Sequence, residues 1–235
     1  MSQNNPDDNE EDNGKSFDWK SHVALCIEPA PEHPVYGMTF TEFLNYRGKY
    51  WGEYGKEKTG LGFRLPPEIT DWIPRLARRH HMHATRYIGL ALELGLITFQ
   101  KDYNDSYHAI NTRLDTMFYA VGDSTERLSK LGQISKQTIK LGSATRENKL
   151  YNPTIAEEIV DAVTGTASEI NCTKSDLVFV CVCLGIRSDY NEKQLPGAFM
   201  AFVSSTIAKF ESELEELDMR TLEMYNKISN QKTHA

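Results

Sequence analysis

Two stretches of this chain share one pattern of apolar residues: residues 65–85, LPPEITDWIPRLARRHHMHAT, and residues 155–175, IAEEIVDAVTGTASEINCTKS. Each is followed by an apolar run that ends in a matching triplet, Leu94-Gly95-Leu96 and Leu184-Gly185-Ile186. Such agreement at low identity indicates an ancient duplication, and a unit this small cannot bury its own apolar face. We therefore expect the two copies to pack together. The aligned pairs are Leu65 with Ile155, Ile69 with Ile159, Ile73 with Val163, Ala77 with Ala167, and Thr85 with Ser175.

Each copy is predicted to form a strand, a helix, a turn and a second helix. In the first copy, apolar residues alternate over residues 61–65, which is the period of a half-buried strand. They then recur at helical spacing over residues 69–77. Pro74 would break a helix begun much earlier, because its ring clashes with a carbonyl four residues back. We therefore expect a short first helix from about Trp72 to His80, with Asp71 as its N-cap.

The turn and the second helix follow the same order in both copies. A turn that needs a left-handed residue is expected at His81-Met82-His83, and Asn171 occupies the equivalent place in the second copy. Thr85 and Ser175 are of the residue types that cap helix N-termini. In the second copy we expect helices at about residues 156–171 and 174–186.

This order of elements resembles the ribbon-helix-helix family of DNA-binding proteins. The resemblance covers residues 58–97 and 149–187, here called the first copy and the second copy. The first copy carries the family's strand-to-helix signature at Arg64-Leu65-Pro66. The resemblance implies two antiparallel strands in the DNA major groove, and a phosphate at the N-terminus of the second helix. The implied fold is mainly α with a short β-ribbon, built as tandem ribbon-helix-helix-like units, each followed by a long helix.

The resemblance assigns the DNA contacts to outward strand positions and to the first turn of the second helix. Charge favours the first copy, since residues 47–86 hold nine basic and four acidic residues, while residues 149–186 hold two and five. A phosphate backbone attracts the first segment and repels the second. We therefore expect the second copy to be a packing partner or a protein-binding face. The predicted DNA-binding residues are Lys58, Gly60, Gly62, Arg64, Thr85, Arg86 and Tyr87.

Composition divides the remainder of the chain. Residues 1–20 hold six acidic and two basic residues and are expected to form a disordered acidic tail. Residues 21–57 form an aromatic N-terminal extension, in which Thr39 and Glu42 make the capping box of a short helix over residues 40–49. Its aromatic side chains are expected to pack over the core. The predicted order is then residues 58–134, the first unit plus a long helix; residues 135–148, a basic linker; and residues 149–230, the second unit plus a long helix.

Two long segments, residues 110–131 and 200–228, place apolar residues at alternating three- and four-residue steps, which is typical of a coiled coil. Each follows one copy after a similar junction, Tyr103-Asn104-Asp105 or Tyr190-Asn191-Glu192. Burying a Leu or Phe side chain is worth roughly 1.5–3 kcal/mol, so the C-terminal seam needs a partner. We expect a homo-oligomer through the C-terminal helix, or alternatively a fold-back of that helix on residues 107–131.

Several classes of protein are not expected. No stretch approaches the roughly 20 apolar residues that span a bilayer, and the start lacks the features of a signal peptide. A cytoplasmic, nucleoid-associated protein without a membrane partner is therefore expected. We find no glycine loop for phosphates, no HExxH and no nucleophile motif, so we expect no enzyme, no cofactor and no small-molecule substrate. The four cysteines lack metal-ligand spacing and are expected to be reduced and largely buried, and the histidines at 80, 81 and 83 are expected to form a polar turn.

Two functions remain. The first is a sequence-specific protein that binds double-stranded DNA, either a transcription regulator or a plasmid partition or transfer accessory factor. The alternative is a protein-interaction scaffold that keeps the fold for helix pairing without DNA binding. Arg64 and the local positive charge favour the first function. The second is favoured by Gly60 and Gly62, which have no side chain to contact a base, and by the acidic second copy.

Overall fold

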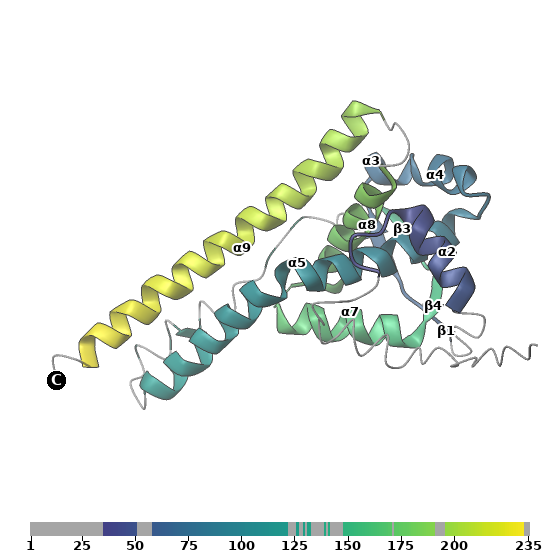
Figure 1. The fold of residues 1–235 in the computed structure, drawn as a ribbon. Coiled ribbons are helices and arrows are strands. Elements are labelled where there is room, and N and C mark those ends of the chain that lie inside the picture. Colours follow the sequence, from purple (N-terminus) through teal and green to yellow (C-terminus); the bar gives the residue numbers. More distant parts are fainter. Residues whose placement is uncertain are drawn as a thin grey trace, which may run out of the picture.

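Helices make up most of the described chain, with short antiparallel strands between them (Figure 1). This computed structural model describes residues 35–50, 58–121, 148–170, 172–190 and 196–232, together with residues 126, 129, 131, 132, 139 and 141. The predicted class, mainly α with a short β-ribbon, is confirmed. The elements are α2 (Phe40–Tyr50), β1 (Lys58–Gly60), β2 (Phe63–Leu65), α3 (Pro67–Thr70), α4 (Ile73–Arg79), α5 (Ala84–Val121), β3 (Lys149–Tyr151), β4 (Thr154–Ala156), α7 (Glu157–Glu169), α8 (Lys174–Tyr190) and α9 (Gly197–Lys232).

The four short strands form one ribbon. Strand β1 pairs with β4 and β2 pairs with β3, both antiparallel. In the first ladder Gly60 faces Thr154, and in the second Phe63 faces Tyr151. From one pair to the next, one strand advances by three residues and the other goes back by three, so the two ladders share one register. The gap between the two ladders coincides with Pro153, which has no N–H to donate. The carbonyl of Pro153 still accepts a hydrogen bond from the N–H of Leu61 at 3.1 Å. Each copy thus contributes one strand.

The ribbon has a buried face and an exposed face, as the alternation of residue types predicts. Positions of odd number point mostly into the core, with Lys149 an exposed exception, and those of even number point mostly outward. The buried set comprises Leu61, Phe63, Leu65, Tyr151, Pro153 and Ile155.

The first helix of the first copy is split by its prolines. A single turn, α3, starts after Pro66 and ends at Thr70, and α4 then begins at Ile73 with Pro74 in its first turn, where proline is tolerated. The expected short helix from Trp72 to His80 is confirmed to within a residue. Its expected N-cap was wrong: Trp72 occupies that position, and Asp71 closes α3 instead.

The turn after α4 has the predicted left-handed residue, His81, with φ of 52°. The predicted N-caps of the second helices, Thr85 and Ser175, lie instead inside the first turns of α5 and α8. The residues just before these helices are His83 and Thr173. Asn171 lies outside the described residues.

The second helices of the two copies, α5 and α8, cross at very close range. A methyl group built on Gly95 would lie 1.7 Å from the carbonyl oxygen of Cys181, and one built on Gly185 would lie 2.0 Å from that of Ala91. In the alignment of the two copies, Gly95 is equivalent to Gly185 and Ala91 to Cys181. The contact is therefore reciprocal, and the two copies are related by an approximate two-fold axis. These glycines come from the triplets that the duplication preserved.

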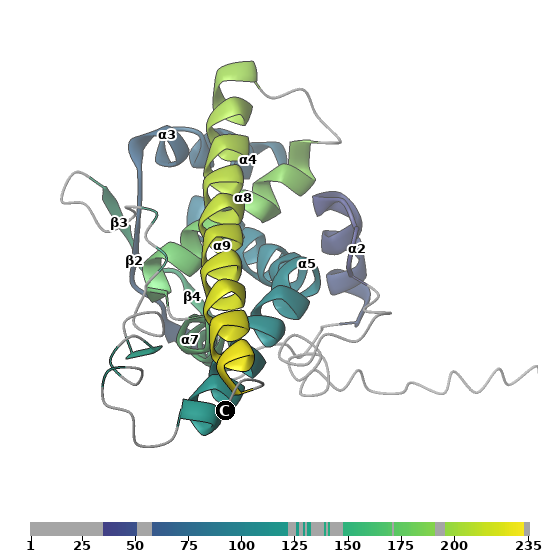
Figure 2. The same ribbon diagram turned by 90° about the vertical axis from the view of Figure 1, so that its left-hand side faces the viewer.

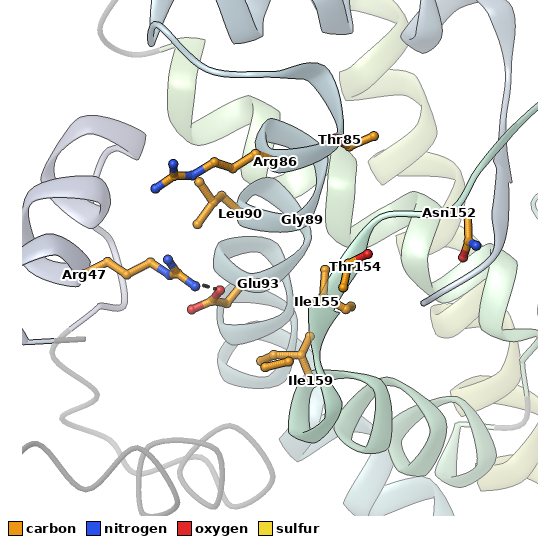
Figure 3. A pocket seen from close by; sticks show the side chains of 11 residues that line it. Arg47, Thr85, Arg86, Gly89, Leu90, Glu93, Asn152, Thr154, Ile155 and Ile159 are labelled. Atoms are coloured by element: carbon orange, nitrogen blue, oxygen red, sulfur yellow. Dashed lines mark ion pairs between the residues drawn. The ribbon is translucent and has the colours of Figure 1, made fainter. Parts of the chain in front are cut away.

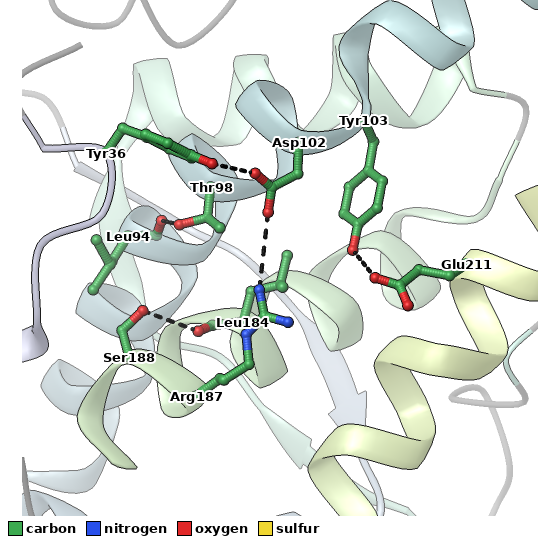
Figure 4. Close-up of polar contacts among 9 residues, drawn as sticks. All are labelled: Tyr36, Leu94, Thr98, Asp102, Tyr103, Leu184, Arg187, Ser188 and Glu211. Atoms are coloured by element: carbon green, nitrogen blue, oxygen red, sulfur yellow. Dashed lines mark hydrogen bonds and ion pairs between the residues drawn. The ribbon is translucent and has the colours of Figure 1, made fainter. Parts of the chain in front are cut away.

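The same symmetry continues one turn further along (Figure 4). The hydroxyl of Thr98 donates to the carbonyl of Leu94 at 3.1 Å, and the equivalent Ser188 donates to Leu184 at 3.3 Å. Beyond this point the two halves diverge. Helix α5 runs without a break to Val121, whereas α8 ends at Tyr190 and a separate helix, α9, starts at Gly197. The junction predicted at residues 103–105 was therefore wrong, because these residues stay helical.

Helix α9 packs along α5, and both helices run toward the same end of the molecule (Figures 1 and 2). Arg113 and Asp218 form an ion pair at 2.5 Å, and the hydroxyl of Tyr103 donates to Glu211 at 2.8 Å (Figure 4). The pKa of Tyr103 lies well above its ordinary value because of burial and the adjacent Glu211 carboxylate.

The apolar seam of α9 is covered within one chain. The fold-back alternative is the arrangement in this structure, and pairing of α9 with a second chain stays a prediction. A small distal cluster of Met117, Val121, Leu131 and Ile228 extends the contact. The buried seam consists of Val203, Ile207, Phe210, Leu214 and Leu217.

Three smaller predictions are confirmed among the described residues. Thr39 and Glu42 form the capping box of α2, with the N–H of Thr39 donating to the Glu42 carboxylate at 2.8 Å. Phe40 and Phe43 from this helix are fully buried, so the part of the N-terminal extension that the structure describes packs over the core. Cys181 and Cys183 are free, fully buried thiols, and burial raises their pKa. The acidic tail, Cys26 and most of the predicted linker lie outside the described residues.

Replacing Gly95 with alanine tests the helix crossing. The added methyl group would overlap the backbone of α8, so we expect the free energy of unfolding to fall by about 2–3 kcal/mol or more. Gly165→Ala is the matched control, since Gly165 lies exposed within α7 and no atom lies within 4 Å of its new methyl group. That change should raise stability by up to about 1 kcal/mol. Urea unfolding of both variants gives the comparison, and equal effects would contradict the close crossing.

Candidate nucleic-acid interface

Six residues form the side of the ribbon that points away from the core, here called the outer face. The first copy supplies Gly60, Gly62 and Arg64, as predicted, and their cross-strand neighbours come from the second copy. The strand of the second copy therefore lies beside that of the first, as expected of copies that pack together, and it brings residues of the second copy onto the outer face, which was expected of the first copy alone. Apart from the half-buried Arg64, the face is exposed: Gly60, Gly62, Leu150, Asn152 and Thr154.

Arg64 is held along the ribbon rather than projecting freely. Its Nη1 donates to the backbone carbonyl of Asn148 at 2.9 Å, which ties β2 to the start of the opposite strand. This bond uses one of the five N–H donors of the guanidinium group. A planar group fixed in this way at a strand end can offer its remaining donors in a defined direction.

Asn152 lies at the centre of the ribbon, and its amide covers Gly60. A methyl group on Gly60 would lie 2.9 Å from Oδ1 of Asn152, so the glycine makes room for this side chain. Asn152 is also equivalent to Gly62 in the alignment, and extending the register places these two residues opposite one another near the approximate two-fold axis. Sequence reasoning missed Asn152 and Thr154, because Pro153 and the outward Leu150 obscure the alternation of that strand.

The start of α5 presents a second candidate contact. Thr85 and Arg86 are exposed, and the N–H of Tyr87 donates to the carbonyl of His83 at 3.0 Å. The amides of Thr85 and Arg86 precede that bond, so they have no acceptor within the helix. Helix N-termini attract anions for this reason, and Arg86 adds a full positive charge.

Tyr87 does not fit the predicted contact, because its N–H, which was expected to meet a phosphate, already donates to the carbonyl of His83. It is fully buried, and its hydroxyl donates to the carboxylate of Asp189 at 3.0 Å. Nε2 of His80 lies 2.9 Å from the other oxygen of Asp189, and the ring of Phe40 packs against both His80 and Tyr87. Burial first, and then Asp189, hold the pKa of Tyr87 well above its ordinary value. These side chains join α2, α4, α5 and α8 into one core.

The start of α8 differs in charge from the start of α5. Asp176 occupies the position equivalent to Arg86. The hydroxyl of Thr173 accepts a hydrogen bond from the N–H of Asp176 at 3.0 Å and donates to its carboxylate at 2.9 Å. This helix end thus carries its own anion, and only Lys174 adds a neighbouring positive charge. The two equivalent helix ends therefore cannot bind phosphate equally well.

A pocket of about 490 Å³ lies between α5 and strand β4 (Figure 3). The side chains of Arg86, Glu93 and Arg47 lie on the side that faces α2, and Thr154 and Ile155 lie on the side of the ribbon. The guanidinium of Arg47 is 3.4 Å from the carboxylate of Glu93, which is almost completely buried. Sequence reasoning gave no sign of this pocket, because its residues come from three separate segments of the chain.

The remaining expectations concern metals and membranes. Among the described residues, no group of three or more His, Cys, Asp or Glu side chains is placed to hold a metal ion. Of the predicted histidine cluster, His80 is directed into the core, while His81 and His83 are exposed. No described helix has both the length and the apolar composition to cross a bilayer. Lys58 pairs through its backbone with Ala156, but its side chain lies outside what the structure describes.

Comparison of the chain with protein-family models, with curated proteins and with solved structures finds no match.

Tyr87→Phe tests whether this tyrosine is structural. Removing the hydroxyl leaves an oxygen of the buried Asp189 carboxylate without its donor, so the free energy of unfolding should fall by about 1–3 kcal/mol. Thermal unfolding measures this change. Thr85→Ala, at an exposed position, should change stability by less than about 0.5 kcal/mol. If Tyr87→Phe is as stable as the parent protein, the hydrogen bond to Asp189 does not support the core.

Proposed function

We propose that this chain is a sequence-specific DNA-binding protein composed of two tandem ribbon-helix-helix-like units. In this proposal the outer face of the ribbon enters the major groove of double-stranded DNA. The observation that carries it is the single register by which both copies contribute to one exposed antiparallel ribbon. A two-stranded ribbon matches the width of the major groove. The biological role would be that of a transcription regulator or of a plasmid partition or transfer accessory factor, acting in the cytoplasm on the nucleoid.

The residue types on the outer face support base contact. Arginine donates two hydrogen bonds to guanine, asparagine pairs with adenine, and an apolar side chain can contact the methyl group of thymine. Arg64, Asn152 and Leu150 belong to these three types, and Thr154 can hydrogen-bond to several bases. Arg64 comes from the first copy and the other three residues come from the second, so both strands would contribute to base recognition.

Phosphate contact would be one-sided. The exposed start of α5 carries Arg86, while the equivalent end of α8 carries Asp176 in a capping box. A phosphate oxygen near Asp176 would be repelled, and near Arg86 it would be attracted. The base contacts would therefore be shared by both copies, and the backbone contact would come mainly from the first copy.

One specific observation favours the scaffold alternative. The outer face carries no charged side chain apart from Arg64, and Leu150 is 59 % exposed there. Such a surface could equally contact a protein. Absence of any DNA affinity at low salt would select this alternative.

Arg64→Ala and Asn152→Ala should each weaken binding to the selected site by about 1–3 kcal/mol relative to random DNA, because each removes a base contact. The site is first obtained by selection from a random duplex library. Arg78→Ala is the matched control, an exposed arginine on α4 whose Nε bonds to the carbonyl of Pro74. Fluorescence anisotropy titrations give the ratios. If the three variants lose affinity equally on both DNAs, the ribbon does not contact bases.

Arg86→Ala should weaken binding to all sequences alike and reduce the slope of log affinity against log salt by about one. Lys174→Ala, in the first turn of the other helix, should leave that slope nearly unchanged, since Asp176 already opposes a phosphate there. Titrations at several salt concentrations separate the two cases. Equal changes in slope would mean that both helix ends contact the backbone.

A further inference from the structure

We propose that the pocket between α5 and strand β4 is a binding site for a small organic anion with an apolar body, such as an aryl or alkyl carboxylate, phosphate or sulfonate. Its volume of about 490 Å³ is within the range of small-molecule sites. The proposal goes beyond DNA binding and does not depend on it. It also adds a ligand to a chain whose sequence predicted no small-molecule substrate.

The residues that line the pocket include positions at which the two copies differ. Gly89 lies on its wall, and a methyl group built there would lie 3.0 Å from Cγ2 of Ile155. The equivalent residue of the second copy is Phe179, which is buried next to Phe202. The second copy therefore carries a large aromatic side chain at a helix position where the first copy has none. The pocket lies beside this position of the first copy.

Two charged residues of the pocket are also particular to the first copy. Arg86 and Glu93 line it, and their equivalents in the second copy are Asp176 and Cys183. A glutamate that is only 3 % exposed is unusual in a helix packed on a ribbon, and here it faces the guanidinium of Arg47 at 3.4 Å. Such a pair costs desolvation energy that a packed apolar residue would not. Retaining the pair beside an open pocket is consistent with a binding role.

The chemistry of the lining defines the ligand class. Two guanidinium groups, from Arg47 and Arg86, accompany one carboxylate, from Glu93, so the side chains leave one net positive charge for an anion. The wall beneath them is aliphatic, and Leu90, Ile155 and Ile159 offer contact to an apolar body. Guanidinium groups bind carboxylate, phosphate and sulfonate oxygens through two parallel hydrogen bonds.

Binding here would be coupled to the proposed function. Arg86, Asn152 and Thr154 line the pocket and also belong to the surface proposed to face DNA. A ligand that engages Arg86 would compete with a DNA phosphate for the same group. This coupling rests on the proposed function, whereas binding of the ligand does not.

The test uses the full-length protein and the aryl sulfonate 8-anilinonaphthalene-1-sulfonate as a fluorescent probe. We expect one saturable site. Arg86→Ala should weaken it by about tenfold, because a charge-assisted hydrogen bond is lost, and Arg86→Lys should recover part of the affinity. Gly89→Phe, which copies the residue of the second copy, should abolish saturable binding, with circular dichroism confirming that the variant is folded. Arg78→Ala should change affinity by less than about twofold, since this arginine lies outside the pocket.

The proposal is overturned if no saturable binding occurs, or if Arg86→Ala weakens the probe no more than Arg78→Ala does. Should Gly89→Phe fail to fold, the comparison of Arg86→Ala, Arg86→Lys and Arg78→Ala still decides the outcome. A last measurement adds duplex DNA to the probe complex. Release of the probe supports the shared use of Arg86. A protein that binds the probe at this pocket but has no DNA affinity would sustain this inference and refute the proposed function.

Discussion

The close crossing of α5 and α8 is the constraint on which the rest of the structure depends. Gly95 and Gly185 allow each helix backbone to touch the other, and any side chain at these positions would hold the helices apart. Because the contact is reciprocal, it also sets the approximate two-fold relation of the copies. That relation brings the strand that precedes each helix pair into one register with its counterpart, and so it produces a ribbon from segments that lie far apart in the chain.

Because both copies belong to one chain, equivalent positions of the two copies can change independently. In a homodimer, each substitution appears twice. Here some equivalent positions keep the same contact, as with Thr98 and Ser188, while others have diverged, as with the exposed Arg86 and the buried Asp176. The first copy can then be basic and line a pocket, while the equivalent region of the second copy is acidic and is filled by side chains. Both proposals, the one-sided phosphate contact and the anion pocket, follow from this divergence on a shared frame.

The added helices stabilise this frame without taking part in the ribbon. Helix α2 places Phe40 over the buried group of His80, Tyr87 and Asp189, and α9 covers the apolar seam of α5. Asp189 is fully buried, yet its two oxygens are engaged by His80 and Tyr87, which offsets the cost of removing a carboxylate from water. The apolar seam of α9, which was expected to need a partner, is thus covered within the same chain.

The sequence by itself indicated the duplication and determined the helical class, the short first helix that begins just before Pro74 and the left-handed turn at His81, because apolar periodicity and backbone restrictions act locally. It also identified Arg64 and Arg86 as candidate contacts, of which Arg64 is half-buried and Arg86 exposed. The tertiary structure alone decided that Tyr87 is buried, that Asn152 shares the face of Arg64, and that a pocket opens beside Gly89. These features depend on which segments meet across the helix crossing, and local patterns carry no information about partners that are distant in the chain.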